Sequence, residues 1–157
     1  MTIKDTHSLN QVAEFHTTFK HPVVTRPAIP SKERCALRIA LLAEELKELQ
    51  QAVEDNDLVE VADALCDLQY VLSGAVLEFG LGEKFKELFD EVHRSNMSKA
   101  CKTAEEAEKT IEHYKSKDGT ESYHQEADGL YLVYRTADNK TLKSVNYSPA
   151  ALEDILL

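Results

Sequence analysis

Two long helical patterns that meet at a three-residue turn constrain this chain more than any other feature. The first covers residues 31–54 and the second residues 58–79, and apolar residues recur in both at helical spacing. Only Asp55, Asn56 and Asp57 separate them. Helices joined by so short a turn are antiparallel neighbours. The sequence therefore predicts a helical hairpin at the centre of an all-α fold.

Two shorter helical patterns flank this hairpin. A first helix is expected over residues 9–20, and an extended connection with three prolines follows it. A fourth helix is expected over residues 83–94. The stretch 61–77 is apolar almost all round, so we expect its helix to be the central buried one. Together the four helices indicate a four-helix-bundle-type domain over residues 1–100.

The chain changes character after residue 100. A short charged helix is expected over residues 103–115, followed by a polar, mobile loop over 116–128. Residues 130–134 and 141–145 are expected to pair as a small β-hairpin, with its turn at Asp138 and Asn139. We therefore predict a C-terminal extension over residues 101–157, made of this helix, the loop and the hairpin.

Composition excludes several classes of function. The formal net charge of -10 argues against non-specific nucleic-acid binding, which needs a basic surface. The three widely spaced cysteines fit reduced thiols better than a disulfide framework. No signal peptide and no membrane-spanning run is recognisable in the sequence. We expect a cytoplasmic protein that binds neither nucleic acid nor a membrane.

Carboxylates gather on the first helix of the hairpin. Glu45 and Glu48 are three residues apart, and Glu44 and Glu48 are four apart, so the three side chains can converge on one face. A solvated acidic face is the alternative interpretation, and Lys47 favours it.

The second helix of the hairpin adds Asp67, which lies within an apolar run. Burying an unpaired carboxylate there would be costly, and a metal ion or a cationic partner would relieve that cost. Asp63 and Glu60 lie on the same face, at intervals of one turn. Glu60 has an alternative role as the return partner of a capping box that begins at Asp57.

The two acidic groups are expected to face each other. Counted from Asn56, Glu48 lies 8 residues back, and Asp63 and Asp67 lie 7 and 11 residues on. At about 1.5 Å per residue, these positions have similar heights along an antiparallel pair. Several clustered carboxylates suit Mg²⁺, with Mn²⁺ as a substitute, rather than Zn²⁺.

A basic, polar segment ends the fourth helix, with the sequence His-Arg-Ser-Asn-Met-Ser-Lys over residues 93–99. Its side chains Arg94, Asn96 and Lys99 are candidate ligands for phosphate groups. The alternative is that these cations only complement the dipole of the helix C-terminus. Tyr70, like Phe15 and Phe19, is a candidate for stacking on a base, and core packing is its alternative role.

The combination of motifs resembles the all-α NTP pyrophosphatase superfamily. The resemblance rests on Glu-Glu-x-x-Glu at residues 44–48, the acidic pair on the next helix, residues 93–99, and the tail over 138–149. The closest likeness is to the MazG-like and phosphoribosyl-ATP pyrophosphohydrolase-like branch, which is related to the dimeric dUTPases. In that superfamily, a Glu-Glu-x-x-Glu motif on one helix and a Glu-x-x-Asp motif on the next hold the metal.

Two registers of the second motif fit this sequence. Glu60 and Asp63 match Glu-x-x-Asp literally. The surrounding apolar residues favour instead a register in which Asp67 is the family's aspartate. Ala64 then stands where the family has glutamate, and Asp63 replaces the missing carboxylate. By this resemblance, Glu45, Glu48, Asp63 and Asp67 are the expected metal ligands.

The resemblance also implies an activity. The superfamily cleaves the bond between the α- and β-phosphates of a nucleoside triphosphate, giving a monophosphate and pyrophosphate. Glu44 or Glu45 would activate the attacking water, while Arg94, Asn96 and Lys99 would bind phosphates and Tyr70 the nucleotide. Phosphoribosyl-ATP or dUTP is an alternative substrate. The superfamily forms four-helix units, so we expect a homodimer or homotetramer.

Two other functions remain open from the residues. A di-iron helical bundle would need Glu-x-x-His on core helices, and only Glu121 and His124, in a polar segment, have this spacing. A non-catalytic helical interaction module would leave the acidic faces merely solvated and without a metal.

Overall fold

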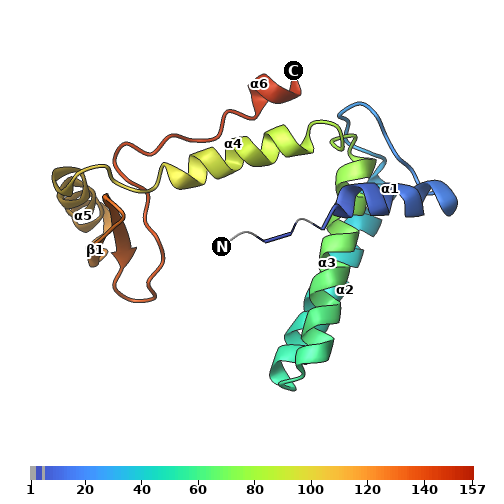
Figure 1. Cartoon of the computed structure of the whole chain (residues 1–157), viewed down its shortest axis with the longest axis horizontal. Coiled ribbons are helices and arrows are strands. Elements are labelled where there is room, and N and C mark those ends of the chain that lie inside the picture. The colour runs from blue at the N-terminus through green and yellow to red at the C-terminus, as the bar shows by residue number, and fades with distance from the viewer. Residues whose placement is uncertain (1–2, 5) are drawn as a thin grey trace. The chain divides into compact units, whose positions relative to one another are not determined.

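The computed structural model describes residues 3, 4 and 6–157 and is mostly helical, with one small antiparallel hairpin (Figure 1). The elements are helices α1 (Ser8–Thr18), α2 (Lys32–Glu54), α3 (Leu58–Glu78), α4 (Phe85–Met97) and α5 (Ala104–Asp118), strands β1 (Ser122–Ala127) and β2 (Leu130–Arg135), and helix α6 (Glu153–Leu156). The chain forms two compact units, Met1–Phe85 and Lys86–Leu157. No helix in the described part is both long and apolar enough to cross a membrane.

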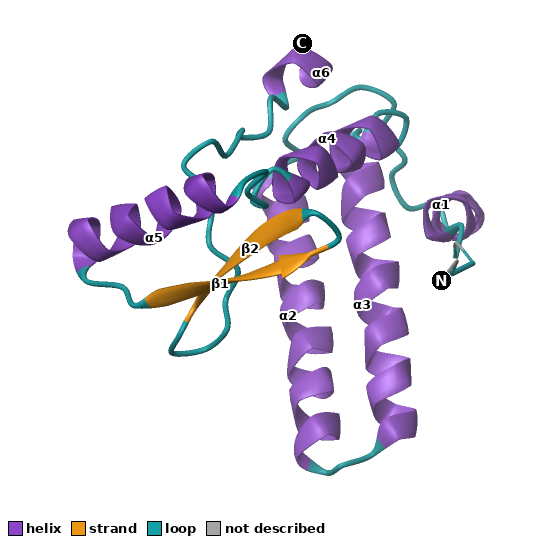
Figure 2. Ribbon diagram, turned by 60° about the vertical axis from the view of Figure 1, so that its left-hand side comes forward, coloured by secondary structure: helices purple, strands orange, loops and turns teal. Residues whose placement is uncertain are grey.

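The α2–α3 hairpin forms as expected. The side chain of Ser31 caps α2 by accepting a hydrogen bond from the backbone N–H of Arg34. Asp57 caps α3 by accepting from the backbone N–H groups of Val59 and Glu60, at 2.9 and 3.2 Å. Asn56, with a φ of 54°, makes the left-handed turn between the helices. The two helices run side by side (Figure 2), and α1 packs against α3.

The C-terminal end of α3 is closed by the segment that follows α1. The backbone N–H groups of Val24 and Ala28 donate to the carbonyls of Leu77 and Phe79, both at 3.0 Å. Gly80 ends the helix with a φ of 69°, and a Cβ there would meet the carbonyl oxygen of Arg26 at 2.0 Å. Only glycine therefore allows this close backbone approach.

The expectation that α3 is buried all round is wrong for much of its length. Its last turns, from Ser73 to Glu78, are mostly buried, but Leu58, Leu65 and Leu72 are 80%, 51% and 42% exposed. The reason is that, within the unit Met1–Phe85, helix α1 packs against α3 at only one end of the α2–α3 pair.

The expected β-hairpin has a different partner strand and a different turn. β1 pairs with β2 in the register Ser122 to Arg135 through Ala127 to Leu130. Thr141 makes only an isolated bridge, with Tyr134. The segment 116–128, expected to be a mobile loop, thus contains the end of α5 and all of β1. The hairpin packs on α5 around Cys101, Ala107, Val133 and Leu142.

Candidate active site

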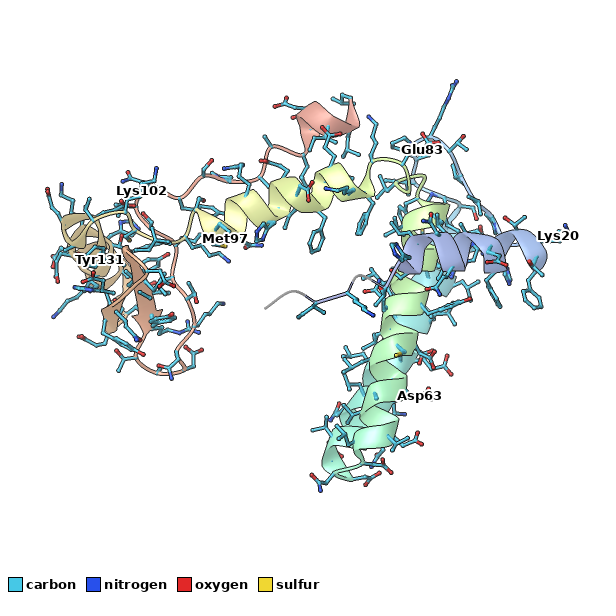
Figure 3. The ribbon with its side chains drawn as sticks, viewed as in Figure 1. Lys20, Asp63, Glu83, Met97, Lys102 and Tyr131 are labelled. Atoms are coloured by element: carbon cyan, nitrogen blue, oxygen red, sulfur yellow. The ribbon has the colours of Figure 1, made fainter. Side chains whose placement is uncertain are left out.

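The acidic residues of α2 and α3 share one electrostatic environment. The pKa of Glu45 is raised, first by burial and then by the negative charges of Asp67, Glu48, Glu44 and Asp63. These carboxylates come from both helices of the hairpin, so the expected facing of the two acidic groups is reflected in the charge that acts on Glu45. Figure 3 labels Asp63 on α3 between the turn and the end that α1 covers.

The carboxylates of this acidic face have no paired cation among the described residues. Within the described residues, none of these five carboxylates forms an ion pair with a lysine, arginine or histidine. Nor do any three described His, Cys, Asp or Glu side chains already stand as a set of metal ligands. Exposed like charges repel, and a divalent cation among them would remove that repulsion. The donor chemistry, carboxylate oxygen throughout, fits Mg²⁺ or Mn²⁺.

The two registers of the α3 motif differ in their relation to this face. Asp63 and Asp67 both raise the pKa of Glu45, whereas Glu60 is not among the groups that shift it. Ala64 is only 4% exposed, so the place of the absent glutamate lies in the packed part of α3. Asp63 and Asp67 are thus close enough to the glutamates of α2 to act on Glu45 electrostatically.

Glu60 does not complete the expected capping box. Asp57 caps α3 through its carboxylate, but its own backbone N–H donates to the carbonyl of Ala52 at 3.0 Å. Only one half of the box therefore forms.

A cavity of about 240 Å³ lies on the same helical hairpin, one turn away from the acidic residues. It is lined by Phe15, His16, His21, Arg34, Leu37, Arg38, Leu41, Tyr70 and Val71. The ring of Phe15 meets that of Tyr70 edge-on at 5.5 Å and stacks on His21 at 5.9 Å. Leu41 precedes Glu45 by one turn and Tyr70 follows Asp67 by three residues, so this aromatic cavity adjoins the acidic face.

A buried ion cluster beneath the cavity was missed by the sequence analysis. Glu78 is 1% exposed and accepts hydrogen bonds from Arg34, with Nε to Oε2 at 3.0 Å, and from Arg38. Burial raises the pKa of Glu78, but the bonds from the two arginines outweigh this and hold it below its usual value. The signal in the sequence was Arg38 within the apolar stretch of α2 and Glu78 at the end of the apolar run of α3.

His16 and Gly74 complete the packing of this cluster. The His16 ring is 2% exposed, and its Nδ1 lies 2.8 Å from the carbonyl oxygen of Pro22. Burial lowers the pKa of His16 despite that bond, so the ring is neutral at pH 7. A Cβ at Gly74 would lie 2.8 Å from Nη1 of Arg38, so glycine leaves the space that the guanidinium fills.

The three candidate phosphate ligands after α3 do not act as one group. Arg94 binds Glu91 through Nε and Nη2, at 2.7 and 2.8 Å, and also contacts Ser148 and Pro149. Lys99 instead donates to the side-chain oxygen of Asn96 at 2.8 Å. Asn96 is exposed, whereas its neighbour Ser95 on α4 is buried.

Comparison with known proteins places the chain in a family. A family model described as phosphoribosyl-ATP pyrophosphohydrolase matches residues 12–96, more than half of the chain. The chain is also 26% identical to an uncharacterized protein of Acanthamoeba polyphaga mimivirus, and the alignment covers 92% of this chain and 94% of that protein.

The matched region contains both acidic helices, the aromatic cavity and most of α4. The match supports a hydrolase with a nucleotide pyrophosphohydrolase type of activity. It agrees with the resemblance of the sequence to the MazG-like all-α NTP pyrophosphatases. The chain belongs to the phosphoribosyl-ATP pyrophosphohydrolase family.

Proposed function

We propose that this protein is a Mg²⁺-dependent pyrophosphohydrolase that cleaves a nucleoside triphosphate between its α- and β-phosphates. One observation carries the proposal: carboxylates from two antiparallel helices act on Glu45 beside an aromatic cavity, and the described part of the chain pairs no cation with them. An uncompensated acidic face is expensive unless a cation binds there. The family match supports the general type of reaction.

Glu45, Glu48, Asp63 and Asp67 would hold Mg²⁺, or Mn²⁺ in its place. The bound ion would polarise phosphate oxygens and offset their charge. Glu44, or Glu45 when it is not fully engaged as a ligand, would accept a proton from the attacking water. A raised pKa suits Glu45 for this role, because a general base works best when its pKa is near the working pH. One water is consumed, the anhydride bond breaks, and a monophosphate and pyrophosphate leave.

The aromatic cavity is the proposed site for the base. Phe15 and Tyr70 form its walls, and planar heterocycles stack favourably on such rings. Asn96 and Lys99 are proposed as ligands for phosphate groups of the substrate. We further propose a cytoplasmic homodimer or homotetramer, in which a second copy covers the exposed apolar residues of α2 and α3.

Phosphoribosyl-ATP is a second candidate substrate, because the matching family model carries that name. A dUTPase-type activity is a third possibility within the same chemistry. The pure protein should be incubated in Mg²⁺ or Mn²⁺ with canonical and modified nucleoside triphosphates, dUTP and phosphoribosyl-ATP. We expect monophosphate and pyrophosphate from at least one of them. No turnover with any substrate, together with no stoichiometric metal binding by calorimetry, would indicate a non-catalytic module instead.

A further inference from the structure

One stripe of α4 binds the C-terminal segment of the same unit. The stripe has the helical spacing i, i+3, i+4 and i+7 and consists of Glu91, Arg94, Ser95 and, just after the end of α4, Ser98. These side chains therefore lie on one face. The segment 144–151, here called the strap, lies against that face through side-chain and backbone hydrogen bonds.

Arg94 and Glu91 hold the strap by its C-terminal half. Arg94 donates from Nη1 to the hydroxyl of Ser148 at 3.1 Å and from Nη2 to the carbonyl of Pro149 at 3.0 Å. Glu91 accepts the backbone N–H of Ala151 at 2.8 Å. The bonds from Arg94 and Ala151 lower the pKa of Glu91 to about 2, so the carboxylate stays charged over the working pH range.

The serines of the stripe hold the N-terminal half of the strap. The hydroxyls of Ser95 and Tyr147 lie 2.8 Å apart, and the backbone N–H of Ser148 donates to Ser98 at 2.9 Å. The backbone N–H of Ser144 donates to the carbonyl of Lys99 at 3.3 Å. The strap thus bonds directly to the residue that is the proposed phosphate ligand.

The geometry of a helix separates Arg94 from the other two candidates. Successive residues are rotated by about 100°, so the side chains of Arg94 and Asn96 point about 160° apart. Asn96 and Lys99 lie on one side and contact each other. Arg94 also uses four of its N–H groups on Glu91, Ser148 and Pro149, which leaves little of its donor capacity for a phosphate.

We propose that Arg94 is a positioning residue: with Glu91 it clamps the strap, and the clamped strap fixes Lys99 and Asn96 for the phosphates. The kinetic part of this inference rests on the proposed function, whereas the clamp itself does not. The clamp can therefore be tested without turnover.

Hydrogen exchange followed by mass spectrometry on the full chain tests the clamp. Arg94→Gln, Glu91→Gln and Ser148→Ala should each speed exchange at the strap amides, of which those of Ser148 and Ala151 are hydrogen-bonded to α4. Arg135→Gln is the matched control, because Arg135 pairs with Asp138 at i, i+3 in the same way but away from the strap. Unchanged strap exchange in Arg94→Gln and Ser148→Ala would overturn the proposal.

Measurements of kcat/KM with the best substrate distinguish two roles for Arg94, a clamp on the strap and a direct phosphate ligand. A clamp predicts that Arg94→Gln and Glu91→Gln lower kcat/KM by a similar factor, on the order of 10- to 100-fold, because small displacements of positioning groups are that costly. The double variant should lose no more than either single one, since both act through the strap. Arg94→Lys should not rescue, because lysine lacks the planar fork that reaches Ser148 and Pro149.

A phosphate ligand predicts the opposite pattern. Of the two glutamine variants, only Arg94→Gln would then lower kcat/KM, and Glu91→Gln would leave it unchanged. Arg94→Lys would retain much of the original kcat/KM, because lysine still supplies a positive charge. That result would overturn the positioning role. Absence of turnover in the unmodified protein would count against the proposed function, while the exchange experiment would still decide whether Arg94 clamps the strap.

Discussion

At Glu45, the protonation state that favours the stability of the fold differs from the one that the proposed metal binding requires. Burial and four neighbouring carboxylates favour its neutral form, so the ionised form is destabilising in the metal-free protein. Because its pKa is raised in the folded state, this destabilisation is absent at low pH and appears as pH rises through the ordinary carboxylate range. A metal ligand, however, must be ionised. Under the proposed function, the acidic face would give up stability in the metal-free protein in exchange for binding a cation.

Asp67→Asn tests this conflict. Removing the charge that acts most strongly on Glu45 should raise the melting temperature of the metal-free protein at pH 7 slightly, because interactions between solvent-exposed charges are worth at most about 1 kcal/mol. The same change should abolish the stabilisation that Mg²⁺ or Mn²⁺ gives. Thermal unfolding with and without metal measures both. Glu60→Gln is the control, and an equal loss of metal stabilisation in it would support the literal register instead.

Glu78→Gln tests the buried ion cluster. The change leaves the guanidinium of Arg38 without its counter-charge in a site where Arg38 is 7% exposed. Breaking a buried ion pair by removing one partner costs about 3–5 kcal/mol. Urea denaturation should show this loss in the free energy of unfolding. Glu54→Gln, at an exposed carboxylate on α2, should change it by less than about 0.5 kcal/mol. If Glu78→Gln left the free energy of unfolding unchanged, the ion cluster would contribute nothing to stability.

At the scale of elements, the sequence predicts α2 and α3 well because local signals agree there. Long apolar periodicity, the caps at Ser31 and Asp57, and a short turn all favour the same hairpin. These helices also carry the acidic residues, so the grouping of Asp63 and Asp67 with Glu45 could be predicted from spacing alone. The cavity and the ion cluster could not, since they depend on how α1 and the proline-containing connection fold onto α3.

The prediction of the hairpin was wrong because it placed the turn at Asp138 and Asn139, whereas the stronger turn signal is Asp128-Gly129. Asp128 and Gly129 have φ values of 50° and 77°, the two left-handed residues that a tight hairpin turn requires. β1 is polar and half-exposed, so its composition resembles that of a loop. Packing of the hairpin on α5, rather than apolar alternation, makes this segment a strand.

Gly129→Ala tests the turn. A residue with a Cβ costs roughly 1–2 kcal/mol in the left-handed region, so the free energy of unfolding should fall by about that amount. Gly129→Asn should cost less, because asparagine tolerates this conformation. Chemical denaturation compares the two. Equal stability of Gly129→Ala and the unmodified protein would contradict the assignment of the turn.

At the scale of the whole molecule, exposed apolar residues on the α2–α3 hairpin favour self-association. Leu46, Leu58 and Val59 are 59%, 80% and 76% exposed in the single chain. Sedimentation velocity should therefore show a dimer or tetramer, which Val59→Lys should weaken by placing a charge in the interface. Thr17→Lys, at an exposed position on α1, is the control. A monomer at micromolar concentration would contradict this expectation.

Pyrophosphate release in Mg²⁺ tests the central claim most directly. With the best substrate of the nucleotide panel, the unmodified protein and the Glu60→Gln variant should both be active. Each should release one pyrophosphate for every monophosphate. Asp67→Asn should lose nearly all turnover while keeping its helix content by circular dichroism. Undiminished release by Asp67→Asn, or none by the unmodified protein, would contradict the assignment of the α2–α3 acidic face as the site of hydrolysis.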